Sequence, residues 1–550
     1  MNKTTKKTVC LLLTAFMGIA CGCGEENSAV SSVEETPNYT QSAYTFTTIF
    51  TDGVQKKLKA YNPDAPEENG CVVYDVYSNI GDDNYLALDI QTDVDLVGYI
   101  NYYKNGEASV KNSEKFFIEA NSTRFTTFLD AYRLGAQGGY AKTISTISFQ
   151  NVDATKEGTF TFKAMGISDR KLDTNEEMYI SNGSTVLGTS PYYGGCITYL
   201  EKIEEDVYEY MDSDGNICID RDVDPDAVSQ VVSDKVNLVN IYDLGREIQP
   251  SYYSNVTEEN GYKPDYDPED KDSYYQGINE SGKPIYNPIQ CGDFGGHTPQ
   301  IIDYEYSKDR LYIKMKGQEW FFYTNIQAKG YMEVTYYFDK TGALIVDNRY
   351  IDFSQFINVY DVSICSQETP ATYFVYPLNY FYCETKQGVI FDKNVGEMNG
   401  RTETKTSLRD SVAGDYVYGI KGNMVKNGWC AFVNENKFGV GIYLPNADLY
   451  SASRGRKSVS YFAEEANRKY HKDYFQFDES QIVPSYTTIN YSYINPGLIR
   501  RMIDFVPLEY SYALYIGDTD QMGTAFKELK TSGRLTNEHL TDETQGWPTK

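Results

Sequence analysis

Sugar recognition is the chemistry that the residue types of this sequence suggest first. Two neighbouring segments, VNLVNIYDLGREIQPSYYS (236–254) and YNPIQCGDFGGH (286–297), concentrate amide, guanidinium and phenol groups. Amides and guanidinium groups make directional hydrogen bonds to hydroxyls, and a tyrosine ring offers a flat apolar face with a polar tip. These segments predict a substrate-binding site made of Asn240, Arg246, Gln249, Tyr252, Asn287 and Gln290.

A structural role is the alternative for the same residues. Arg246 can pair with a nearby carboxylate such as Asp243, while the tyrosines fill the surface of a β-sheet. The same choice applies to Trp429, which follows Gly428 at the start of an apolar run. Its ring predicts a stacking platform for a sugar, and core packing is the alternative.

Carboxyl groups are the second requirement for sugar hydrolysis. A glycosidase uses two of them, about 5–5.5 Å apart for retention of configuration or about 6.5–9.5 Å apart for inversion. Burial raises a carboxyl pKa and makes the group a usable general acid, so carboxyls within apolar or aromatic strand sequence are the best candidates. We therefore predict Glu333 as the acid, Glu368 as its partner and Asp352 as a third catalytic candidate. The alternative is that each accepts hydrogen bonds from the backbone.

Strands must position these groups, and the composition favours them. The chain of 550 residues holds 51 tyrosines and 15% aromatic residues, which suit half-buried sheet surfaces. Residues 45–190 show short alternating runs between turn residues and predict a β-sandwich, with one helical piece around 123–134. Residues 191–535 predict a second, larger β-domain, and 536–550 a polar tail. We expect an all-β protein with few short helices.

Local signals predict several connections of the larger domain. Asp339–Gly342 and Asn434–Asn436 are typical of hairpin turns, and the first of these places Glu333 and Asn348 on neighbouring antiparallel strands. Asp518 precedes TDQMGTAFKELKTS and Gly533 follows it, which predicts a short capped helix. The loop DSDGN (212–216) fits a hairpin better than a calcium loop, because Tyr210 and Arg221 would fall at ligand positions.

The order of several motifs extends this prediction to a fold family. The pieces are GGCITYL (194–200), NIYDLGREIQPSYY (240–253), YNPIQCGD (286–293), DNRYIDFS (347–354), QETPATYF (367–374) and WCAFVNENKFGVGIYLP (429–445). Together they resemble secreted bacterial glycan-associated proteins with a galactose-mutarotase-like β-supersandwich. The resemblance implies a concave sheet face that carries a carbohydrate site.

The N-terminus predicts export and lipid anchoring. Residues 1–20 combine lysines with the apolar run VCLLLTAFMGIA, which is typical of a signal peptide and too short for a membrane span. Gly18-Ile19-Ala20-Cys21 resembles a bacterial lipobox, with Cys21 or else Cys23 as the lipidated residue. Residues 21–44 form a polar tether. We expect a lipoprotein on the extracellular face of the bacterial cell membrane, with an ordinary secretory signal as the alternative.

Charge and motif content narrow the partners. The formal charge of -28 argues against nucleic acid and against an anionic membrane surface, so the N-terminal lipid is the membrane contact that we expect. Neutral glycans fit this charge better than strongly anionic ones. Nucleotide and metal-hydrolase motifs are absent from the sequence, and no pair of its 10 cysteines has CxxC spacing, so we expect no cofactor and no metal.

Three functions are compatible with these features. The first is a surface lipoprotein that binds and hydrolyses a neutral or weakly charged glycan, with a lyase using Tyr252 or Tyr253 ranked lower. A second is a non-catalytic glycan-capture lipoprotein, and a third is an adhesin that binds protein. Hydrolysis requires two carboxyls beside Arg246, capture requires the aromatic and amide groups alone, and adhesion predicts a flat aromatic patch.

Overall fold

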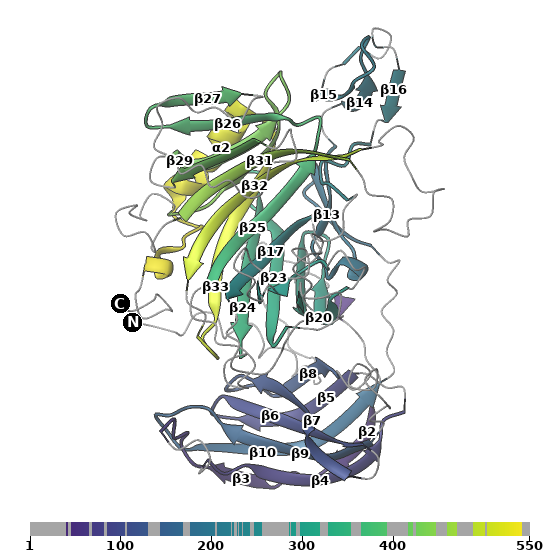
Figure 1. Cartoon of the computed structure of the whole chain (residues 1–550), viewed down its shortest axis with the longest axis vertical. Coiled ribbons are helices and arrows are strands. Elements are labelled where there is room, and N and C mark those ends of the chain that lie inside the picture. Colours follow the sequence, from purple (N-terminus) through teal and green to yellow (C-terminus); the bar gives the residue numbers. More distant parts are fainter. Residues whose placement is uncertain are drawn as a thin grey trace, which may run out of the picture. The chain divides into compact units, whose positions relative to one another are not determined.

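Antiparallel β-strands make up most of the chain, as the apolar alternation and the tyrosine content predict (Figure 1). This computed structural model places its described residues within one compact unit, Tyr39–Lys550. The described residues are 40–541 except for 42–45, 65–68, 82–84, 105–106, 130–142, 169–176, 204–205, 222, 225–227, 229, 234, 242–246, 256–284, 287, 293–297, 320–327, 354–364, 393–415, 422–424, 447–458, 470–487 and 501–502.

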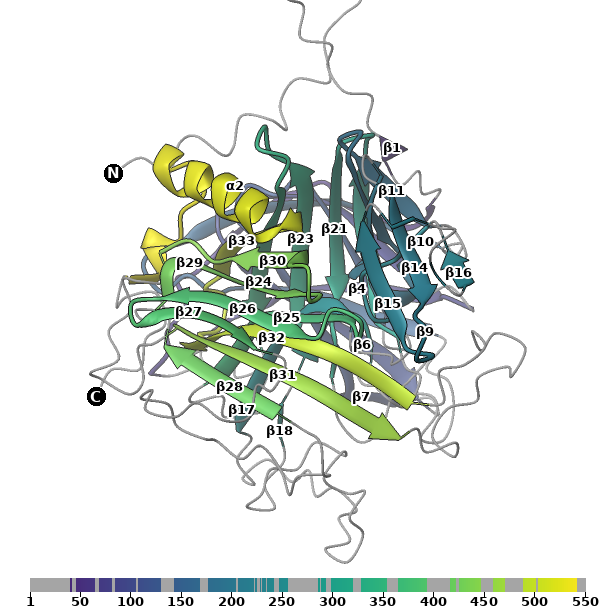
Figure 2. The same ribbon diagram turned by 90° about the horizontal axis from the view of Figure 1, so that it is seen from above.

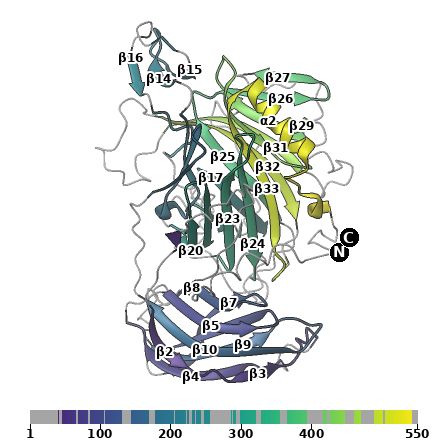
Figure 3. The same cartoon turned by 180° about the vertical axis from the view of Figure 1, so that it is seen from behind.

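Two small sheets form the N-terminal sandwich (Figure 3). The first contains, in spatial order, β4 (Val72–Asn79), β9 (Thr143–Asn151), β6 (Leu96–Lys104) and β7 (Glu107–Ile118). The second contains β2 (Thr47–Thr51), β10 (Gly158–Ser168), β5 (Tyr85–Thr92) and β8 (Arg124–Phe128), with β3 (Gln55–Leu58) also paired to β10. Aromatic side chains fill the space between them, with Phe149 in contact with Phe160, Phe162, Phe116 and Tyr74.

The helix predicted around 123–134 was wrong over the part that the structure describes. Arg124–Phe128 is strand β8, which pairs antiparallel with β5. Phe125 and Thr127 are both buried two residues apart, which is the period of a strand. The neighbouring strand β5 supplies hydrogen bonds that the local sequence pattern could not reveal.

A ten-stranded sheet forms one layer of the larger body. Its strands, in spatial order, are β1 (Thr40–Gln41), β20 (Gln300–Tyr306), β21 (Arg310–Lys316), β23 (Gly330–Phe338), β24 (Leu344–Asp352), β33 (Leu508–Asp518), β30 (Phe438–Tyr443), β29 (Val425–Val433), β26 (Tyr380–Thr385) and β27 (Gly388–Asp392). The predicted turns at Asp339–Gly342 and Asn434–Asn436 are confirmed, since they join β23 to β24 and β29 to β30.

An eleven-stranded sheet forms the other layer. Its main path is β11 (Met178–Ser181), β12 (Thr185–Thr189), β13 (Ile197–Lys202), β17 (Ile248–Asn255), β25 (Cys365–Val375), β32 (Thr488–Arg500), β31 (Val459–Lys469) and β28 (Tyr416–Lys421), with β18 (Ile285–Tyr286), β19 (Pro288–Ile289) and β22 (Gln318–Glu319) beside β17. A separate small sheet holds β14 (Val207–Met211), β15 (Ile217–Arg221) and β16 (Gln230–Ser233). The predicted turn 212–216 is confirmed between β14 and β15.

The two large sheets share one apolar core, and this fixes which residues point away from it. Met332 and Val334 of β23 face that core, as do Tyr252 of β17 and Phe374 of β25. Successive residues of a strand point to opposite faces. Glu333 therefore projects from the outer face of the ten-stranded sheet, away from the eleven-stranded one.

The helix predicted before Gly533 is confirmed as α2 (Thr519–Ser532). The Asp518 side chain accepts the N–H groups of Asp520 and Gln521, and Gly533 ends the helix in the left-handed region at φ 61°. Phe526 packs against Trp429, and α2 lies against β33, β30 and β29 (Figure 2). The last turn of the described chain, η9 (Glu538–Thr541), follows it.

The predicted fold class, an all-β protein in which a β-sandwich precedes a larger two-sheet body, is confirmed. Strands β11 and β12 pair with β13 in the eleven-stranded sheet rather than with sandwich strands. Among the described residues, no helix is long and apolar enough to cross a membrane.

Candidate functional site

Strand β17 carries most of the predicted binding segment that the structure describes. It lies between β13 and β25 in the eleven-stranded sheet. Arg246 and Asn287 lie outside the described residues, so their predicted roles in substrate binding stay predictions. The lipidation residue Cys21 also lies outside them.

Asn240, Gln249 and Gln290 are brought together around β17 and are buried. The Asn240 N–H donates to the Tyr373 carbonyl at 3.0 Å. The Gln249 side-chain oxygen accepts the Cys291 N–H at 2.9 Å, and the Gln290 amide donates to the Gly194 carbonyl at 3.3 Å. The side chains of Gln249 and Gln290 and the backbone of Asn240 hold neighbouring segments in place. Burial keeps all three side chains from a ligand's hydroxyls.

The two predicted aromatic contacts are core residues. Tyr252 stacks on Tyr350 with ring centroids 4.3 Å apart, between the two large sheets. Trp429 is 2% exposed and packs between Tyr382 and Phe526. Neither ring offers a free face for stacking on a sugar.

The outer face of the eleven-stranded sheet gathers a different set of groups. Ser251 lies opposite Glu368, and because Tyr252 faces the core, both of these side chains project from the outer face. Tyr373 and Tyr493 also project there, with ring centroids 4.5 Å apart. The Tyr493 hydroxyl donates to Glu368 Oε1 at 2.5 Å. We call Glu368, Tyr373 and Tyr493 the outer-face cluster.

Irregular backbone gives this cluster its shape. The pairing of β25 with both β17 and β32 shifts register between Glu368 and the Ala371–Thr372 segment. The Thr369 hydroxyl donates to the Pro496 carbonyl at 2.6 Å and fixes the bulge. Such bulges re-aim side chains at a sheet surface. Glu368 is partly exposed there, while the two tyrosines beneath it are nearly covered.

Glu333 belongs to a separate charged network on the ten-stranded sheet. Its Oε1 lies 3.0 Å from Arg349 Nη1 and 3.6 Å from Lys314 Nζ, and Tyr312 donates to its Oε2 at 3.2 Å. Burial raises the pKa of Glu333, but the charges of Lys314 and Arg349 lower it by more, so the net shift is downward. A carboxyl held ionised in this way is a poor proton donor. The raised pKa expected from burial alone is therefore not found.

Asp352 lies in the core between the two large sheets, apart from both Glu333 and Glu368. It is 0% exposed and accepts the Tyr350 hydroxyl at 3.0 Å on Oδ2, inside the core between the large sheets. Glu333 projects from the outer face of one sheet and Glu368 from the outer face of the other. No two of these three carboxyls flank a common bond, which a glycosidase requires of its catalytic pair.

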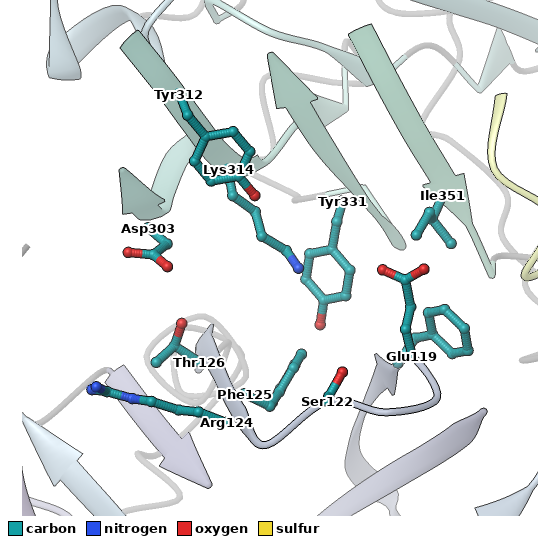
Figure 4. A pocket seen from close by; sticks show the side chains of 11 residues that line it. Glu119, Ser122, Arg124, Phe125, Thr126, Asp303, Tyr312, Lys314, Tyr331 and Ile351 are labelled. Atoms are coloured by element: carbon teal, nitrogen blue, oxygen red, sulfur yellow. The ribbon is translucent and has the colours of Figure 1, made fainter. Parts of the chain in front are cut away.

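A polar pocket lies beside the Glu333 network (Figure 4). Its volume is about 130 Å³. The sandwich contributes Glu119, Ser122 and Arg124, and the ten-stranded sheet contributes Asp303, Tyr312 and Lys314, among other lining residues. Sequence reasoning missed this pocket, because its two halves lie almost two hundred residues apart and no local motif marks either.

A second feature that sequence reasoning missed is a group of potential metal ligands. The ligand atoms of Cys196, Glu247 and Cys291 all lie within 4.8 Å of one another, and the three residues are buried. They are the residues in the described part of the chain that could hold a metal ion as a group.

Comparison with known proteins gives little further definition. No protein-family model matches the chain, and no curated protein matches it. A solved structure with some likeness is the glycoside hydrolase domain of Endo-D from Streptococcus pneumoniae R6, with a TM-score of 0.16 and 8% sequence identity. The alignment covers 54% of this chain and 36% of that one. A TM-score of 0.16 is too low to define a shared fold, so the resemblance to the galactose-mutarotase-like class stays a prediction.

Proposed function

We propose that this protein is a surface lipoprotein that binds a neutral or weakly charged glycan at the outer-face cluster of its eleven-stranded sheet. One observation carries the proposal, namely the partly exposed Glu368 carboxylate, which the Tyr493 hydroxyl holds at 2.5 Å, with the Tyr493 ring centroid 4.5 Å from that of Tyr373. A fixed carboxylate accepts hydrogen bonds from sugar hydroxyls, and the Tyr493 hydroxyl holds the Glu368 carboxylate in position for them.

Binding is favoured over cleavage by the placement of the carboxyls. Of the three predicted catalytic carboxyls, Glu368 lies at the outer-face cluster. Glu333 lies on the outer face of the ten-stranded sheet, and Asp352 lies in the core between the two large sheets. The chain therefore captures a glycan rather than hydrolysing it. The signal peptide and the lipidation of Cys21 predicted from the sequence support attachment to the extracellular face of the bacterial cell membrane through a lipid. The formal charge of -28 disfavours strongly anionic polysaccharides and nucleic acid.

The experiment is a binding and sugar-release screen over neutral, weakly charged and anionic polysaccharides. The protein used is Tyr39–Lys550, because strand β1 begins at Thr40 and pairs with β20. Glu368→Gln and Tyr493→Phe test the cluster. Glu333→Gln is the matched control, since it makes the same chemical change on the other sheet.

We expect retention of a neutral glycan without sugar release, weakened about 10-fold or more by Glu368→Gln, as for the loss of a hydrogen bond to a charged group of about 1.5–3 kcal/mol. Glu333→Gln leaves binding unchanged. If the wild type releases sugar and Glu368→Gln abolishes this release, the protein is a hydrolase and the capture proposal is wrong. Binding that only Glu333→Gln weakens would move the site to the polar pocket of Figure 4.

A further inference from the structure

Three potential metal ligands meet where β13 and β17 begin to pair in the eleven-stranded sheet, although they are far apart in the sequence. Cys196 follows the Gly194-Gly195 turn just before β13, Glu247 directly precedes β17, and Cys291 lies shortly after β19. The two sulfur atoms and a carboxylate oxygen lie within 4.8 Å of one another. All three residues are 0% exposed.

The chemistry of this donor set selects a particular kind of ion. Thiolates favour soft or borderline metals, and zinc accepts thiolate and carboxylate ligands together in tetrahedral sites. Calcium and magnesium prefer oxygen ligands alone. We propose that Cys196, Glu247 and Cys291 bind a zinc ion.

Ligation requires the thiols to lose their protons. Zinc binding releases one proton from each thiol, and both sulfur electron pairs then bond to the metal. Zinc affinity at this site therefore rises with pH.

In the metal-free site, a thiol proton takes the place that the zinc ion would occupy between the ligands. The Cys291 thiol donates to Glu247 Oε2 at 2.6 Å. Sulfur and oxygen ligands of tetrahedral zinc lie about 3.5 Å apart, so the carboxylate has to move by about 1 Å when the metal replaces the proton. Three protein ligands leave the fourth position of a tetrahedral zinc ion for a water molecule.

The surrounding backbone holds both cysteines in position. Gly194 and Gly195 have φ angles of 62° and 70°, and a Cβ on Gly195 would lie 2.2 Å from an Ile313 carbon. The Tyr336 hydroxyl donates to the Gly195 carbonyl at 2.9 Å, and Gln249 accepts the Cys291 N–H. The zinc ion would therefore tie the entry of β13, the start of β17 and the end of β19 together. The zinc site stands independently of glycan binding.

The test measures the zinc content of the full chain and of its variants by mass spectrometry. Cys196→Ser, Cys291→Ser and Glu247→Gln each remove one ligand. Cys383→Ser and Cys430→Ser are the matched controls, since these two thiols are equally buried and face each other on β26 and β29. Cobalt substitution adds a spectroscopic readout, because thiolate ligation gives a charge-transfer band that oxygen ligation lacks.

We expect about one zinc ion per chain, at least tenfold less in the ligand variants, and full content in the controls. The wild-type chain loaded with cobalt should also show the thiolate band, a result that does not depend on the folding of any variant. Zinc retained by the ligand variants would overturn the proposal. So would a disulfide joining Cys196 to Cys291, or two free thiols at this site in a chain that holds no metal after zinc loading.

Discussion

A buried ion pair joins the N-terminal sandwich to the larger body, and its removal should be costly. Lys316 Nζ in β21 lies 2.9 Å from Glu114 Oε1 in β7, with side-chain exposures of 4% and 2%. Lys316 also donates to the Phe128 carbonyl at 2.7 Å, and the Tyr102 hydroxyl donates to Glu114 Oε2 at 2.9 Å. Lys316→Met keeps the aliphatic stem but removes the Lys316 cation from beside the buried Glu114 carboxylate.

Breaking one side of a buried pair costs about 3–5 kcal/mol, because the remaining charge keeps its desolvation cost and loses its attraction. Urea denaturation of the wild type and of Lys316→Met at neutral pH measures this difference. The double variant Lys316→Met/Glu114→Leu replaces both charges with apolar groups, and we expect it to recover most of the loss.

An exposed pair supplies the control for this measurement. Lys340 lies 3.1 Å from Glu528, with side-chain exposures of 67% and 50%, and Lys340→Met should change the unfolding free energy by less than about 1 kcal/mol. A cost below that value for Lys316→Met would refute the reasoning. A double variant that is no more stable than the single one would also refute it, because the loss would then not come from the unpaired charge.

Two further predictions concern residues that the sequence marked as functional. Because Lys314 and Arg349 outweigh burial and hold the pKa of Glu333 below its ordinary value of 4.5, its ion pairs stabilise the protein above pH 4.5 and lose this effect as the pH falls through the folded-state pKa. The stability advantage of the wild type over Glu333→Gln should therefore shrink in acid, and a difference that is constant with pH would contradict this. Trp429→Ala should cost about 3–5 kcal/mol in unfolding free energy and leave glycan binding by the folded protein unchanged, whereas lost binding at unchanged stability would restore the stacking role.

Local signals in the sequence predicted the elements that depend on a few adjacent residues. The helix Thr519–Ser532 follows from its Asp518 cap and its Gly533 stop, and the hairpins follow from their turn residues. Arg124–Phe128 shows the limit of this approach, because the pairing of β8 with β5 decides its conformation. Long-range pairing of this kind leaves no trace in a short window.

Whether the predicted site residues come together depends on which face of its sheet each side chain projects from. Strand pairing decides this, and the sequence alone does not give it. Glu333 and Glu368 both lie in aromatic strand sequence, yet they project from the outer faces of two different sheets. From the sequence, Trp429 fits a sugar-stacking platform and a core residue equally well. The packing of Phe526 from α2 against its ring shows that it is a core residue. The cysteines at positions 196 and 291 lie nearly a hundred residues apart in the sequence, so their spacing could not predict that they meet at Glu247.

The most direct measurement of the proposed function is hydrogen–deuterium exchange of Tyr39–Lys550 with and without the glycan that it retains. Binding at the outer-face cluster predicts slower exchange in β25 (Cys365–Val375) and β32 (Thr488–Arg500), with β21 (Arg310–Lys316) and β23 (Gly330–Phe338) unchanged. Slower exchange in β21 and β23 alone would place the ligand in the pocket beside Glu333 and contradict the account.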